Sequence, residues 1–130
     1  MKDIASRTDI ELFMDQFYNK LLPDPIVGYI FTEVAQLDLA SHLPVLCDFW
    51  ETVLLGKSSY RGNVMMKHID FHKKSALKTE HFERWQAHFV ETIDSLFQGP
   101  IADEAKRRVE IMKGLMQFKI AKSDEQGFIF

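Results

Sequence analysis

The sequence has a single cysteine, no long apolar run and only a small excess of negative charge, and each of these features excludes a class of protein. Cys47 has no partner within the chain, so the fold cannot be held by an internal disulfide. No apolar stretch approaches the roughly 20 residues that a membrane-spanning helix needs. A net charge of -3 argues against nucleic acid as the main partner, because phosphate binding requires a concentrated basic surface.

The length and the first residues of the chain set further expectations. A chain of 130 residues predicts a single domain over 1–130, and we expect residues 1–7 and 123–130 to form loosely ordered tails. The opening MKDIASRTDI lacks the continuous apolar stretch of a signal peptide. Together with the lone cysteine, this leads us to expect a cytoplasmic protein.

Phenylalanine is unusually abundant, with eleven Phe against three Tyr and two Trp. A pocket for a large flat ligand would need rigid aromatic walls of this kind. A helical core that is simply rich in Phe explains the same composition, and composition alone favours this second explanation.

Apolar residues recur at steps of three and four, which predicts helices and no strands. The first long helix begins with a capping box at Thr8–Glu11 and is ended by Pro23-Asp24-Pro25. Its apolar stripe consists of Ile10, Phe13, Met14, Phe17, Tyr18 and Leu21.

Three more long helices and two short ones complete this all-α prediction. The second long helix starts near Asp38 or Ser41, either of which can cap it, and it stops at Gly56. We place its regular part from Ser41, which keeps Pro44 in the first turn. Thr79 caps the third, and Gly99-Pro100 separates it from the fourth. The segments 26–35 and 64–71 are the short ones.

Histidines at positions 68 and 72 have the i, i+4 spacing of a metal site on one helix face. A third ligand is missing nearby, and Lys67, Lys73 and Lys74 would repel a cation, so this pattern alone is weak. His68 and also His42 lie on apolar faces, where a buried structural histidine is the more common explanation. The sequence contains no Gly-rich phosphate loop, nucleophile elbow or HExxH motif.

Four fragments in this order resemble the truncated haemoglobins, most closely their group III: QFYNKLLPDPIVGYIF, HLPVLCDFWETVLLG, SYRGNVMMKHIDF and FERWQAHFVETI. The similarity covers about Ile10 to Lys122. It implies a truncated globin, in which two antiparallel helix pairs form a two-on-two sandwich around haem b. The Phe-rich interior would then be the haem pocket.

The resemblance also implies roles for individual residues. His68 matches the proximal histidine that ligates iron, whereas His72 matches no ligand. On the opposite face of the haem, Tyr18, His42 and Trp85 match residues that stabilise a bound ligand. The remaining cofactor-binding positions are Phe31, Leu46, Trp50, Tyr60, Arg61 and Met65.

Three functions fit these observations. The first is a haem protein that binds O2, NO, CO or peroxide at a five-coordinate iron and carries out NO dioxygenase- or peroxidase-like chemistry with an external reductase. The second is a reversible O2 carrier or sensor, which needs the same pocket without turnover. The third is a haem-free helical interaction module in which all five histidines are structural.

The two histidines at i, i+4 should behave differently when each is replaced. We expect His68→Ala to lose haem or to bind it weakly, because the only protein ligand to iron is removed. His72→Ala should keep a normal Soret band in the visible spectrum. Equal loss of the Soret band in both variants would contradict the assignment of a single ligand.

Overall fold

The computed structural model describes residues 1–34, 38–60 and 77–126, and over these ranges the chain is all-α, as the sequence predicts. The predicted short helix over 64–71 lies outside the described residues. No helix in the described ranges is long and apolar enough to cross a membrane. The elements are α1 (Arg7–Leu21), the π-helical turn η1 (Ile30–Val34), α2 (Leu39–Leu55), α4 (Thr79–Leu96) and α5 (Pro100–Gln126).

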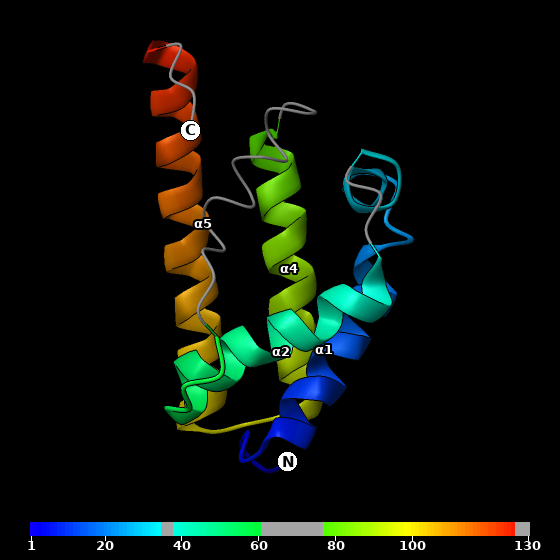
Figure 1. Cartoon of the computed structure of the whole chain (residues 1–130), viewed down its shortest axis with the longest axis vertical. Coiled ribbons are helices and arrows are strands. Elements are labelled where there is room, and N and C mark those ends of the chain that lie inside the picture. Colours follow the sequence, from blue (N-terminus) through cyan, green and yellow to red (C-terminus); the bar gives the residue numbers. More distant parts are fainter. Residues whose placement is uncertain (35–37, 61–76, 127–130) are drawn as a thin grey trace.

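The four α-helices pack as two pairs. In Figure 1, α4 and α5 run antiparallel side by side, while α1 lies next to α4 and α2 crosses in front of it. Contacts join α1 to α2, α4 to α5 and α1 to α4, and α2 also touches α5. The apolar stripes of the helices therefore meet in one core, which is the two-on-two arrangement that the sequence predicts.

Helix α1 begins earlier than the sequence indicates. Its N-cap is Ser6, whose hydroxyl accepts a hydrogen bond from the Asp9 amide at 3.4 Å. The prediction of a capping box at Thr8–Glu11 is therefore wrong, because Thr8 already lies in the first turn. Ile4 is only 1% exposed and anchors the chain just before the cap, a tertiary contact that local pattern does not reveal.

The first residues of the chain are packed, although the sequence predicts a loose tail over 1–7. The Asp3 carboxylate accepts hydrogen bonds from the amides of Ile101 and Ala102 at 2.9 and 2.8 Å. These amides open α5 and have no partner within their own helix. At the other end, α5 continues to Gln126, past residue 123 where the sequence predicts a second tail.

Helix α2 starts at Leu39 with Asp38 as its N-cap, which is the first of the two predicted starts. The regular part therefore begins before Ser41, contrary to the prediction, and Pro44 lies in the second turn. A proline there cannot donate a hydrogen bond to the carbonyl of Ala40. Ala40 and Pro44 are both exposed, so water can satisfy this carbonyl. At the other end Gly56 has φ 71°, which confirms the predicted left-handed stop.

The loop after α1 is held by a buried carboxylate. Helix α1 ends at Leu21, close to the predicted Pro23-Asp24-Pro25 break. Asp24 accepts hydrogen bonds from Arg84 Nε at 2.9 Å, His88 Nε2 at 2.6 Å and the Ile26 amide at 2.8 Å. Although burial opposes the charged form, the bonds from His88, Ile26 and Arg84 lower the pKa of Asp24 to about 2.

Replacement of Asp24 by alanine should lower the free energy of unfolding by about 2–4 kcal/mol, because Arg84 and His88 lose a buried acceptor. The exposed pair Asp94–Lys106 provides the control, and Asp94→Ala should change stability by less than about 1 kcal/mol. Both values can be measured by urea unfolding at pH 7.

The contribution of Asp24 should also depend on pH. Its pKa is lowered from 3.8 to about 2 in the folded chain, so the unfolded chain binds the proton more tightly. The stabilisation is therefore complete above about pH 5 and declines as the pH falls toward 2. A difference between wild type and Asp24→Ala that stays constant down to pH 2 would contradict this.

Candidate functional site

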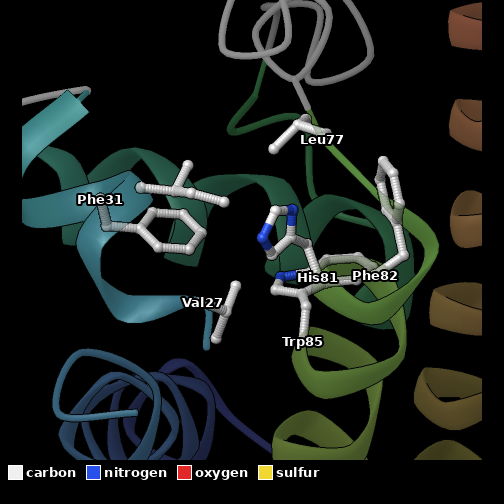
Figure 2. A pocket seen from close by; sticks show the side chains of 7 residues that line it. Val27, Phe31, Leu77, His81, Phe82 and Trp85 are labelled. Carbon is white, nitrogen blue, oxygen red and sulfur yellow. The ribbon is translucent and has the colours of Figure 1, made fainter. Parts of the chain in front are cut away.

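A pocket lies between the segment that precedes and enters η1 and the start of α4. Figure 2 shows Val27 and Phe31 on one side and the side chains of α4 on the other. The pocket is shallow and partly open to solvent: the volume comparable to an enclosed cavity is only about 20 Å³. Its walls are formed by Val27, Ile30, Phe31, Leu77, His81, Phe82 and Trp85.

Three predicted site residues from different elements come together next to this pocket. Tyr18 of α1 lies edge-on to Phe31 of η1 and to His42 of α2, and the ring centres are 6.2 Å apart in both pairs. Tyr18 is only 4% exposed, and burial raises the pKa of its hydroxyl. The hydroxyl therefore stays protonated and remains a hydrogen-bond donor at neutral pH. Phe31 connects this group to the pocket, since it contacts Tyr18 and also lines the wall.

Trp85 lines the pocket, and a residue that is not among the predicted candidates lies beside it. His81 is four residues earlier on α4, 5% exposed, and lines the same pocket. Its Nδ1 accepts a hydrogen bond from the Lys78 amide at 3.0 Å, and its Nε2 lies 3.4 Å from the Tyr29 hydroxyl. The i, i+4 spacing to Trp85 places both side chains on one helix face and could have revealed His81.

The bond from the Lys78 amide also corrects the predicted start of this helix. Lys78 is the N-cap and Thr79 is the first helical residue, so Thr79 is not the cap. His81 is the third helical residue and takes the place of the Glu or Gln of a capping box, because its side chain reaches back to the amide of the N-cap residue. Burial lowers the pKa of His81, which favours the neutral ring that this contact requires.

Other predicted pocket residues lie elsewhere in the described structure. Trp50 is buried among Phe13, Phe49 and Phe89, with ring centres between 5.0 and 6.3 Å away, and is not part of the pocket wall described above. Leu46 is half-buried and packs against the core. Tyr60 lies edge-on to Phe49 at 5.3 Å.

Arg61, Met65 and His68 lie outside the described residues, as does His72. The structure describes the residues on both sides of the segment 61–76. Tyr60 packs on α2, and Leu77 contributes to the pocket wall. Within the described ranges, no group of three His, Cys, Asp or Glu side chains could hold a bare metal ion.

The described walls suit a flat and largely apolar group such as haem. Aliphatic and aromatic side chains make up most of the lining, and the surface that they expose to the pocket is apolar. A porphyrin face needs apolar contacts of this kind, and a ligand on that face needs a few protonated donors. The walls meet the first requirement, and Tyr18 and His42, which lie beside Phe31 and Tyr18 respectively, are polar side chains next to the pocket.

Comparisons with known proteins agree with this geometry. No family model matches the chain. It is 24% identical over 123 residues to the Group 3 truncated hemoglobin ctb of Campylobacter jejuni, covering 92% of this chain and 94% of that protein. The crystal structure of a group III truncated haemoglobin from Campylobacter jejuni superimposes with a TM-score of 0.80 and 25% identity, covering 92% of this chain and 95% of the other.

The chain therefore has the fold of the truncated globins. Both matches confirm its resemblance to group III of the truncated haemoglobins. A globin of this type implies a haem cofactor.

The buried environment of His81 predicts how its ring titrates. Its pKa should lie below the ordinary histidine value of 6.5, because burial disfavours the charged ring more than the neighbouring Glu80 favours it. The stabilisation from its neutral form is present above pH 6.5 and is lost as the pH falls through the lowered pKa. A pH titration of the imidazole resonances by NMR measures this, and a midpoint at or above 6.5 would contradict it.

Proposed function

We propose that this chain binds haem b and, through it, O2 and other diatomic ligands, in the cytoplasm. We propose further that it serves O2, NO or peroxide chemistry with electrons from an external reductase, and not bulk O2 delivery. The observation that carries this proposal is the meeting of Tyr18, Phe31 and His42 beside an apolar pocket. The similarity to group III truncated haemoglobins over nearly the whole chain supports it.

Haem would be held by apolar contacts and by one histidine. Val27, Phe31 and Phe82 would contact the porphyrin, and Trp85 would border it. His68 is the proposed ligand to iron, on the strength of its match to the proximal histidine. When bound, haem supplies an iron with an open position for a diatomic ligand.

The chain's own contribution is a set of donors in a dry environment. The Tyr18 hydroxyl stays protonated because burial raises its pKa, so it can donate to a ligand that carries negative charge. Trp85 lines the pocket and would supply a second donor through its indole N–H, and the His42 ring lies next to Tyr18. Hydrogen bonds are electrostatically stronger away from water.

These donors favour retention of O2 over rapid release. A hydrogen bond to a charged group contributes about 1.5–3 kcal/mol. Since about 1.4 kcal/mol corresponds to a tenfold change in affinity, two such donors would slow release by orders of magnitude. A protein that only delivers O2 needs faster release, which is why we favour ligand chemistry.

The visible spectrum of the purified protein tests the proposal directly. A Soret band that shifts on reduction and again on addition of CO is the expected result. A chain that folds but shows no Soret band, even after addition of hemin, would instead be a haem-free helical module.

Tyr18→Phe should speed the dissociation of O2 from the haem-loaded protein by about tenfold or more, because one donor is lost. The phenylalanine ring preserves the contacts with Phe31 and His42, so the shape of the pocket should not change. Stopped-flow mixing with excess CO measures the rate. CO carries less charge, so its own dissociation should change much less, and an unchanged O2 rate would remove Tyr18 as a donor.

A further inference from the structure

The two walls of the pocket are joined by side-chain hydrogen bonds at two places of unequal strength. One place is the Asp24 cluster, in which Asp24 accepts from Arg84 and His88. The other is the contact between the Tyr29 hydroxyl and His81 Nε2. Tyr29 follows Asp24 by five residues and His81 precedes Arg84 by three. The two places therefore lie along one line of contact between the loop after α1 and helix α4, which we call the seam.

The Asp24 end of the seam is fixed. Its contacts are charge-assisted, between 2.6 and 2.9 Å long, and the carboxylate side chain is 1% exposed. Gly28 adds a second constraint, because a Cβ at this position would lie 2.1 Å from the Leu22 carbonyl oxygen. The backbone just before η1 is therefore held tightly against the end of α1.

The Tyr29 end is weak and faces solvent. The distance of 3.4 Å is near the upper limit of a hydrogen bond, and the two rings meet edge-on with centres 5.9 Å apart. Tyr29 is 37% exposed whereas His81 is 5% exposed, so the phenol is on the solvent side of this contact and the imidazole on the buried side. Behind His81 lies the pocket that it lines with Trp85 and Phe31.

The hydrogen bonds of His81 also determine its tautomer. Because Nδ1 accepts from the Lys78 amide, the proton of the neutral ring is on Nε2, which donates to the Tyr29 hydroxyl. A second proton on the ring would have to occupy Nδ1 and would break the bond from Lys78. The contact as observed therefore requires a neutral His81.

We infer that Tyr29 and His81 form a gate at one side of this partly open pocket, through which small ligands enter from solvent. The gate opens when the Tyr29–His81 contact breaks, while the Asp24 cluster keeps the rest of the seam closed. This role rests on the proposed function, because the pocket that the gate serves is the one assigned to haem.

Acid should open the gate. The titratable and charged groups that act on His81 in the described part of the chain are Lys78 and Glu80 on its own helix and Tyr29 on the facing wall. Protonation of His81 removes the bond from the Lys78 amide and adds charge to a buried ring, which draws the ring toward water. Ligand entry should therefore become faster as the pH falls below 6.

CO rebinding after flash photolysis tests the gate in the haem-loaded protein. At pH 8, Tyr29→Phe should raise the bimolecular association rate by roughly two- to tenfold, the range that the loss of one neutral hydrogen bond allows. The wild-type rate should rise when the pH is lowered from 8 to 5.5, and the rate of His81→Phe should not. Ile26→Ala changes an exposed side chain of the same loop and should leave the rates unchanged.

A readout without haem separates failure of the gate from failure of the proposed function. Xenon binds apolar cavities, and ¹²⁹Xe NMR on the purified apoprotein measures its exchange with the pocket. Tyr29→Phe should speed this exchange relative to wild type and Ile26→Ala, and the wild-type imidazole should show the Nε2–H tautomer at pH 8. Equal CO and xenon rates in all variants, or the Nδ1–H tautomer, would overturn the gate, whereas a missing Soret band would overturn only the proposed function.

Discussion

The contact of Phe89 with Phe13, Phe17 and Trp50 is the constraint on which the rest of the structure depends. It joins α4 to α1 and α2, and its ring centres lie between 5.0 and 5.6 Å apart. Such aromatic pairs contribute about 0.5–1.5 kcal/mol each beyond the burial of their area. Once Phe89 is fixed, Trp85 lies one helical turn nearer to η1, and Tyr18 on α1 lies next to Phe17. The position of the pocket follows from this junction.

The abundant phenylalanines have both of the roles that composition alone allowed, since some of them fill the helical core and others line the pocket. Phe13, Phe17 and Phe89 fill the core, and Phe31 and Phe82 line the pocket. Whether a phenylalanine lies in the core or on the pocket wall is decided only by the way in which the helices cross. Trp50 illustrates the point, because its match to a pocket residue does not prevent it from packing among core rings in this chain.

The sequence predicts the helices well where a long apolar stripe is buried and poorly where tertiary contacts decide. The apolar stripes of α1 and α4 predict both helices. The start of α1 depends on the burial of Ile4, and that of α2 on the exposure of Pro44. The start of α4 depends on the hydrogen bond between the His81 side chain and the Lys78 amide. Tyr18, Phe31 and His42 were found through the family resemblance and not through spacing. His81 was missed because its importance depends on Tyr29, which lies 52 residues earlier in the chain and meets it only after folding.

The cap that Asp3 provides for α5 links the earliest part of the chain to its last described helix. Asp3 and Ile101 are 98 residues apart, so this contact closes a loop that contains every other helix. Closure of so long a loop costs chain entropy that local contacts do not incur, and contacts of this kind form slowly. During synthesis, α1, α2 and α4 all leave the ribosome before the first turn of α5 does. Asp3 must therefore wait for the amides that it caps until almost the whole chain has been made, and the last helix cannot acquire its proper start before that point.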